Sequence, residues 1–349
     1  MLILEEHIAL KDINFFCKQF AAMIQAGISI SMALEVCMQQ CTNKRLKSHL
    51  RNIQEAVMCG DRLSEAAVQE KIFPKLLVHM IECGEASGRL EQVMRQTVDH
   101  FENQLQIRQR IKRALAYPTL VLLTLICVVI VLMIKVVPNF MTLLVETGAQ
   151  IPNSTRIMIG LSDFIMGNWL IILVVCVIGI GISILIPRTK GGKEMIDQVA
   201  LVLPVFGKLK KKSMSANFSA TMSMLISSGI PMLQAIEITK EVMDNAVVRQ
   251  ELEEVMKDLK QGSSLYDALR KSSIYPPILK SMIHIGEETG ALDDMLVKMS
   301  RYFKEEVQLA VEQLMVLMEP MLTIVMAFLV GGFMLAVVQP TFSAATAIM

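Results

Sequence analysis

The segment MIECGEASGRL at residues 80–90 returns as MIHIGEETGAL at residues 282–292, and the two copies organise the rest of the chain around them. The match continues in both directions without a gap, always between residues 202 positions apart. Identical pairs lie on both sides of the two segments: Phe16 with Phe218, Gly60 with Gly262, Pro74 with Pro276, Phe101 with Phe303, Pro118 with Pro320, and Pro138 with Pro340. A self-match this long predicts a duplicated domain rather than a short solenoid repeat.

Each copy is predicted to be a bundle of short helices. Residues 13–25 carry an apolar helical period, and glycines such as Gly60 provide natural left-handed helix ends. A last, longer helix is expected to start near Gly88 in the first copy and Gly290 in the second, and to run on toward the membrane. This pattern gives five or six short antiparallel helices per copy, which is an all-α bundle.

Three stretches carry no charged residue: 114–134, 164–187 and 320–349. Each exceeds the roughly 20 residues that a helix needs to cross the hydrocarbon core of a bilayer. We therefore predict three transmembrane helices, with Pro118 and Pro320 at the start of their spans, where a proline costs least. The middle stretch has no counterpart in the repeat. We expect it to bring the chain back across the membrane, so that the helical bundles of both copies lie on the same side of the membrane.

Positive charge sets the expected orientation. Basic residues gather before the first span and after the second: Arg108, Arg110, Lys112, Arg113, Arg188, Lys190, Lys193, Lys208, Lys210, Lys211 and Lys212. The loop between these spans has only Arg156. By the positive-inside rule both large polar segments are cytoplasmic. The start of the chain has no cleavage pattern of a signal peptide, so we expect the N-terminus in the cytoplasm and the C-terminus outside.

The predicted fold is a polytopic all-α membrane protein of the inner cell membrane, with two homologous cytoplasmic helical-bundle domains and three transmembrane helices. Its expected parts are a cytoplasmic domain (1–113), a first transmembrane helix (114–137), a short extracytoplasmic loop (138–163), a second transmembrane helix (164–187), a second cytoplasmic domain with a basic juxtamembrane flank (188–319), a third transmembrane helix (320–340) and an extracytoplasmic tail (341–349).

Composition argues against several kinds of chemistry. A formal net charge of +1 provides no global basic field for nucleic acid. The chain has no Walker A loop, no GxSxG and no HExxH pattern, so we expect no enzyme activity and no cofactor. Cys37 and Cys41 share a helix face, which leaves a zinc site open, but no second ligand pair follows and reduced, buried thiols are the favoured interpretation.

The candidate structural or partner-contact residues are the prolines Pro118 and Pro320 and six residues of the repeated corner: Gly84, Glu85, Gly88, Gly286, Glu287 and Gly290. In a structural interpretation, a helix stops at the first glycine, Ser87 or Thr289 caps the next helix, and the glutamates satisfy exposed backbone amides. In a functional interpretation, the acidic side chains clustered at this turn form a contact surface for a partner or a site for a divalent ion. Calcium needs about six oxygen ligands, a number that the sequence alone cannot supply, and the structural interpretation is favoured.

Together these motifs resemble the type II secretion system F domain family. The resemblance rests on the doubled G-E-x-x-G-x-L corner, the helix turns at Ala26-Gly27-Ile28 and Ser228-Gly229-Ile230-Pro231, and the pairs Tyr117-Pro118 and Glu319-Pro320. It covers about Phe15 to Phe342. Only about 14 residues precede it, which favours the shorter platforms of pilus or competence systems over larger members.

The resemblance implies a platform role. Members of this family are thought to lie under a growing fibre and to couple a cytoplasmic hexameric ATPase to the extraction of pilins or pseudopilins from the membrane. The expected partners are therefore this assembly or retraction ATPase, the pilins, other inner-membrane assembly proteins, membrane lipid and further copies of the same chain.

One alternative is a small oligomeric membrane transporter or channel, and another is a membrane enzyme. No expected span carries an internal charged residue of the kind that marks an ion pathway, and no catalytic constellation is recognisable. Transport or ATP turnover by the purified protein would favour these alternatives over a platform.

Overall fold

A computed structural model of the chain describes residues 8–136, 160, 168, 190–203 and 206–348. Every regular element among these residues is a helix, and none of them forms a β-strand, which confirms the all-α prediction for this part of the chain. The chain divides into two compact units: Met1–Arg110 with Glu194–Ala310, and Ile111–Lys193 with Val311–Met349. The middle span predicted at 164–187 and the loop predicted at 138–163 lie outside the described residues, apart from two single positions.

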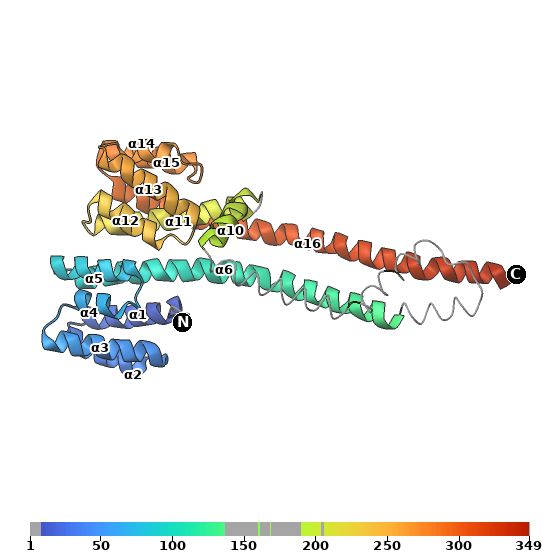
Figure 1. Ribbon diagram of the computed structural model, residues 1–349, viewed down its shortest axis with the longest axis horizontal. Helices are drawn as coiled ribbons and strands as arrows, with labels where there is room; N and C mark the ends of the chain where they lie inside the picture. The colour runs from blue at the N-terminus through green and yellow to red at the C-terminus, as the bar shows by residue number, and fades with distance from the viewer. Residues whose placement is uncertain (1–7, 137–159, 161–167, 169–189, 204–205, 349) are drawn as a thin grey trace. The chain divides into compact units, whose positions relative to one another are not determined.

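The first copy contains five short helices followed by one long helix (Figure 1). These are α1 (Leu10–Gln25), α2 (Ile30–Gln40), α3 (Lys44–Cys59), α4 (Leu63–Glu70), α5 (Lys75–Ser87) and α6 (Leu90–Val131), which continues into a π-helical turn, η1 (Leu132–Val136). The second copy repeats this order after an extra helix. Its elements are α10 (Lys190–Val202), α11 (Phe206–Ser227), α12 (Met232–Val242), α13 (Ala246–Lys260), α14 (Leu265–Arg270), α15 (Pro277–Thr289) and α16 (Leu292–Ile348).

Matched residues begin and end matched helices. The side chain of Asn43 accepts hydrogen bonds from two backbone amides at the start of α3, at 3.1 and 3.3 Å, and Asn245 accepts two at the start of α13, at 2.9 and 3.1 Å. These are N-caps, which satisfy amides that have no partner within the helix. Gly60 follows α3 with a φ of 104°, which confirms the predicted helix end.

Each copy also has its own aromatic core residue at the matched position. Phe16 of α1 is buried and stacks on Phe20, and Phe218 of α11 is fully buried with its ring 4.8 Å from that of Tyr275. Burial of such large apolar side chains is the main favourable contribution to folding.

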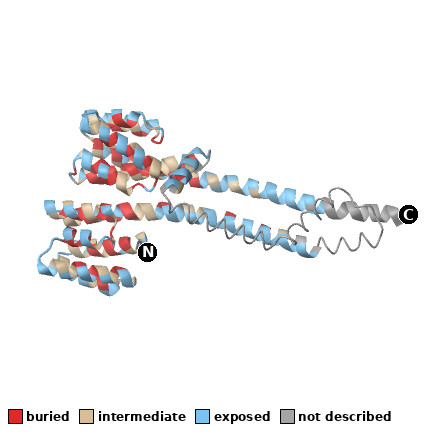
Figure 2. Cartoon of the chain, in the orientation of Figure 1, coloured by how far each residue is buried: buried red, intermediate tan, exposed pale blue. Residues whose placement is uncertain are grey.

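The long helices α6 and α16 hold 42 and 57 residues, and both pass a length and composition test for a membrane span. Their most apolar windows are only 11% and 0% buried, and Figure 2 shows pale blue along these stretches. Large apolar side chains exposed in such numbers indicate a lipid environment rather than a soluble core. The structure thus describes two of the three predicted spans.

The prediction that the two prolines stand where a proline costs least is wrong. Pro118 lies inside α6, and Pro320 lies inside α16, because each span continues a helix that began at Leu90 or Leu292. A proline removes one helical hydrogen bond. Nearby hydroxyls bond to the helix carbonyls: Thr119 donates to the carbonyl of Leu115 at 2.7 Å.

Candidate functional site

The first glycine of each corner does not end a helix, which corrects the prediction for Gly84 and Gly286. Both lie inside their helices, α5 and α15, where the following long helix approaches closely. A Cβ added at Gly84 would lie 2.9 Å from Cα of Leu90, and one at Gly286 would lie 2.8 Å from Cα of Leu292. Glycine is needed here because any side chain would overlap the backbone of α6 or α16.

The second glycine ends the helix. Gly88 and Gly290 adopt φ values of 65° and 67°, a left-handed conformation that glycine accepts without strain. The predicted caps are wrong: the hydroxyl of Ser87 donates to the carbonyl of Cys83, and that of Thr289 donates to Ile285, both at 2.7 Å. A hydroxyl at the C-terminal end of a helix finds the free carbonyl of its own last turn before it reaches the next helix.

The corner glutamates bind the N-termini of other helices. The carboxylate of Glu85 accepts hydrogen bonds from the amides of Leu63 (2.8 Å) and Ser64 (3.0 Å) at the start of α4, and from the Ser64 hydroxyl (2.5 Å). Glu287 accepts from the amides of Leu265 (2.7 Å) and Tyr266 (2.9 Å) at the start of α14.

The two arrangements are equivalent, since every partner in the second copy lies 202 positions after its counterpart. A carboxylate at a helix N-terminus is stabilised both by the unpaired amides and by the helix dipole. In α4 the N-cap residue is Arg62, whose side chain offers no carboxylate or hydroxyl oxygen, so Glu85 supplies the missing acceptor from a distant position. The glutamates therefore act as structural anions that join α5 to α4 and α15 to α14.

The remaining acidic residues of the corners form no ion site among the described residues. No group of three or more potential ligands occurs in the part of the chain that the structure covers. Glu82 pairs with His79 at 3.4 Å, and Glu288 pairs with His284 at 3.5 Å, and both glutamates are exposed. Whether the corners also contact a partner stays a prediction.

The cysteines differ in exposure. Cys17 and Cys37 are buried, and burial raises the pKa of the Cys37 thiol to about 12, which keeps it protonated and unreactive. The prediction of buried thiols is confirmed for Cys37, whereas Cys41 is only partly buried, and Cys59 at the end of α3 is exposed. The apolar period of α3 places this last residue outside its buried face, which consists of Leu46, Leu50 and Ile53.

Polar contacts join the two copies within the first compact unit. Lys75 of α5 pairs with Glu241 of α12 at 2.6 Å, and the hydroxyl of Ser228 donates to the side chain of Gln96 of α6 at 3.0 Å. Lys304 of α16 donates to the side chain of Asn103. The first of these contacts is exposed and is worth little by itself, and the other two are partly buried.

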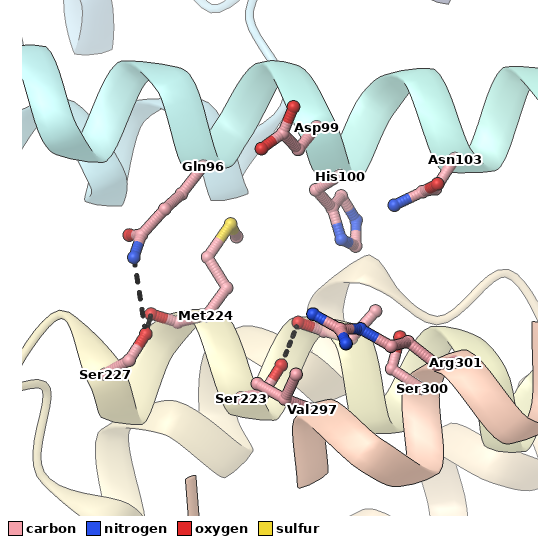
Figure 3. A pocket seen from close by; sticks show the side chains of 11 residues that line it. Gln96, Asp99, His100, Asn103, Ser223, Met224, Ser227, Val297, Ser300 and Arg301 are labelled. Carbon is pink, nitrogen blue, oxygen red and sulfur yellow. Dashed lines mark hydrogen bonds between the residues drawn. The ribbon is translucent and has the colours of Figure 1, made fainter. Parts of the chain in front are cut away.

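A polar pocket of about 250 Å³ lies on the same face (Figure 3). Gln96, Asp99, His100 and Asn103 line it from α6, and Ser223, Ser227, Ser300 and Arg301 line it from α11 and α16. The pocket is large enough for ordered water, which such polar walls would hold.

His100 is the buried titratable group of this pocket. Its ring is 4% exposed, Nε2 lies 2.9 Å from the amide nitrogen of Gln104, and Nδ1 has no hydrogen-bond partner among the described residues. Burial lowers the pKa of His100 to about 4, so the ring is neutral in the folded protein at physiological pH. The sequence did not predict this pocket, because His100 is a single histidine on a helix and no local pattern marks it as part of a site.

Comparison with known protein families finds the same duplication. The chain matches the family described as type II secretion system (T2SS), protein F, twice, over residues 16–138 and 218–340. The chain therefore belongs to this family, as the resemblance indicated. The two matched segments end at Pro138 and Pro340, so each includes one body of short helices and the long helix that follows.

Several curated proteins are similar over most of their length. The type IV pilus assembly protein PilC of Thermus thermophilus is 34% identical over 340 residues, which cover 97% of this chain and 84% of that protein. PilC of Pseudomonas aeruginosa is 31% identical over 333 residues (95% and 89%). The type II secretion system protein F of Pseudomonas aeruginosa is 30% identical over 336 residues (95% and 82%).

Proposed function

We propose that this chain is the inner-membrane platform protein of a type IV pilus-like machine, where it couples a cytoplasmic assembly ATPase to the polymerisation of pilins or pseudopilins. The observation that supports the proposal best is the doubled arrangement of a helical body followed by a long helix with an apolar, exposed second part. The relatives carry names of type IV pilus assembly and of type II secretion, so the proposal does not choose between these two kinds of machine.

The proposed topology has three spans, at 114–137, 164–187 and 320–340. The bodies at 1–113 and 188–319 are cytoplasmic, and the loop at 138–163 and the tail at 341–349 lie outside. The distribution of lysine and arginine supports this orientation. In a cysteine-free background, a single cysteine at Asn153 should then react with a membrane-impermeant thiol reagent applied from outside the cell membrane, whereas one at Ser264 should not.

The mechanical part of the proposal rests on α6 and α16. Each helix holds residues of both compact units without a break in its backbone. A continuous helix is stiff along its axis because its turns are hydrogen-bonded to one another, and Pro118 and Pro320 each remove only one such bond. A push by the ATPase on the cytoplasmic bodies would therefore reach the membrane through these two helices. The protein itself acts as a scaffold in this scheme, with no catalytic step of its own.

A deletion strain tests the platform role. Loss of every extracellular fibre, of secretion and of DNA uptake can be scored by microscopy and uptake assays, with re-expression of the chain as the control. At least one activity should disappear and return with the chain. If all three persist in the deletion strain, the platform assignment fails.

The alternative function, a transporter or channel, can be tested on the purified protein. In the second compact unit α6 and α16 line a cavity of about 630 Å³ whose described lining is apolar except for Thr124. Ion pathways usually need polar or charged groups at membrane depth. Ion or solute flux through proteoliposomes would support the alternative, and we expect none.

A further inference from the structure

Helix α10 buries a charged residue and exposes its large apolar residues, which is the reverse of a helix in a soluble bundle. Among its described side chains the only buried one is an aspartate, Asp197, which is 9% exposed. Its large apolar residues face outward: Met195 is 68% exposed, Val199 52% and Val202 82%. In a soluble bundle the apolar face of a helix is the one that packs.

Asp197 identifies the face of α10 that packs against the rest of the protein. The carboxylate of Asp197 accepts a hydrogen bond from the backbone amide of Ala246 at 2.9 Å, at the first turn of α13, where the helix dipole favours negative charge. Leu201, one turn further on, packs against the core of the first unit. Asp197 and Leu201 are four residues apart, so they lie on one face of α10.

The outward residues lie on the opposite face. Met195, Val199 and Val202 follow the spacing i, i+4 and i+7, and Ile196 joins them, being 42% exposed. No acidic residue interrupts this set, which we call the apolar arc. An arc of this kind needs a partner that is itself apolar.

The surroundings in the sequence favour a lipid surface over a protein partner. The helix starts at Lys190, three residues after the uncharged stretch that ends at Pro187. Three residues span at most about 10 Å, so a chain that leaves the hydrocarbon at Pro187 is still at the headgroup level when α10 begins. Residues 188–212 also contain more basic than acidic side chains: Arg188, Lys190, Lys193, Lys208, Lys210, Lys211 and Lys212 against Glu194 and Asp197.

We propose that α10 lies flat on a bilayer surface that contains anionic lipid, with the apolar arc at the boundary between headgroups and acyl chains. Asp197 holds the other face of the helix on the second copy, so α10 fixes this body against the membrane surface. Amphipathic helices with basic flanks bind such surfaces by apolar burial together with attraction to anionic headgroups. The inference rests on the proposed function in taking the chain to be anchored in the membrane and the middle span to end at Pro187.

Tryptophan fluorescence of the full chain can test this arrangement, because the sequence has a single tryptophan, Trp169. In a Trp169→Phe background, Met195→Trp and Val199→Trp place a reporter on the arc. Glu194→Trp and Gln198→Trp are comparison positions, also exposed and turned by about 100° around the helix from Met195 and Val199. The proteins are reconstituted into vesicles of phosphatidylethanolamine and phosphatidylglycerol, with and without brominated acyl chains.

We expect brominated lipid to quench the reporters at 195 and 199 more strongly than those at 194 and 198. Circular dichroism and elution from a sizing column check that each variant is folded. Equal quenching at all four positions, or quenching at none, would overturn the proposal. In a cysteine-free background, disulfide-linked dimers of Val199→Cys in these vesicles, without lipid quenching of the Val199→Trp reporter, would assign the arc to a second copy instead. None of these readouts depends on fibre assembly, so their failure is separate from failure of the platform role.

Discussion

Replacing Glu85 by glutamine should destabilise the protein more than a surface change does. The carboxylate of Glu85 accepts three hydrogen bonds, from the amides of Leu63 and Ser64 and from the Ser64 hydroxyl. A glutamine presents one oxygen and one NH2 group, and the NH2 group would face an amide that also donates. Hydrogen bonds to charged groups contribute about 1.5–3 kcal/mol, so we expect a loss of about 2 kcal/mol.

The assay is thermal unfolding of the full chain in detergent. A loss of about 2 kcal/mol corresponds to a melting temperature roughly 4–8 °C lower for a unit of this size. Glu82→Gln is the matched control, because Glu82 lies on the same helix with its side chain 62% exposed. The reasoning is refuted if Glu85→Gln melts at the same temperature as Glu82→Gln.

The second copy allows a further check of the same reasoning. Glu287→Gln should cost a similar amount, since Glu287 accepts two backbone amides of α14, and the two losses should add because the sites share no partner. In cells, a double variant present at normal level but unable to assemble fibres would show that the corners also contact a partner. Normal fibres would assign them to stability alone.

Three other changes test neighbouring features. Gly84→Ala should cost about 1–3 kcal/mol by thermal unfolding, because its Cβ would lie 2.9 Å from Cα of Leu90, whereas Gly191→Ala, with nothing within 4 Å, should not destabilise. Asn43→Ala should cost about 1 kcal/mol through loss of the N-cap of α3, and an unchanged melting temperature would contradict the cap. His100 has a pKa of about 4 in the folded protein and an ordinary value of 6.5, so only the unfolded chain takes up this proton between these values. Stability should therefore fall as the pH drops from 6.5 to 4, by about 3 kcal/mol in total, and His100→Gln should remove this part of the pH dependence.

Sequence patterns predicted the duplicated all-α architecture and the described spans because these depend on signals that repeat along the chain. The apolar period and the helix-ending glycines act within one or two turns of helix, and each long uncharged stretch is continuous along the chain. The details of the corner depend on contacts between distant segments. Gly84 is required by the approach of Leu90, and Glu85 binds amides 21 and 22 positions earlier, which no local pattern encodes. The pocket around His100 brings together α6, α11 and α16, and it could not be assembled from the sequence of any one of them.

The duplication separates residues that build each copy from residues that join the copies. The N-cap residues and the corner glutamates recur 202 positions apart: Asn43 with Asn245, and Glu85 with Glu287. The face between the copies does not, since His100 of the pocket corresponds to Tyr302, which is 38% exposed. Two copies of one body meeting through identical patches would form a symmetric contact. Here α6 of the first copy meets α11 and α16 of the second through different side chains, so the two bodies cannot exchange roles. In the proposed platform role, a motor or a pilin would therefore meet two related bodies with different surfaces. Single variants at matched positions should then have unequal effects on assembly even where their effects on stability are equal.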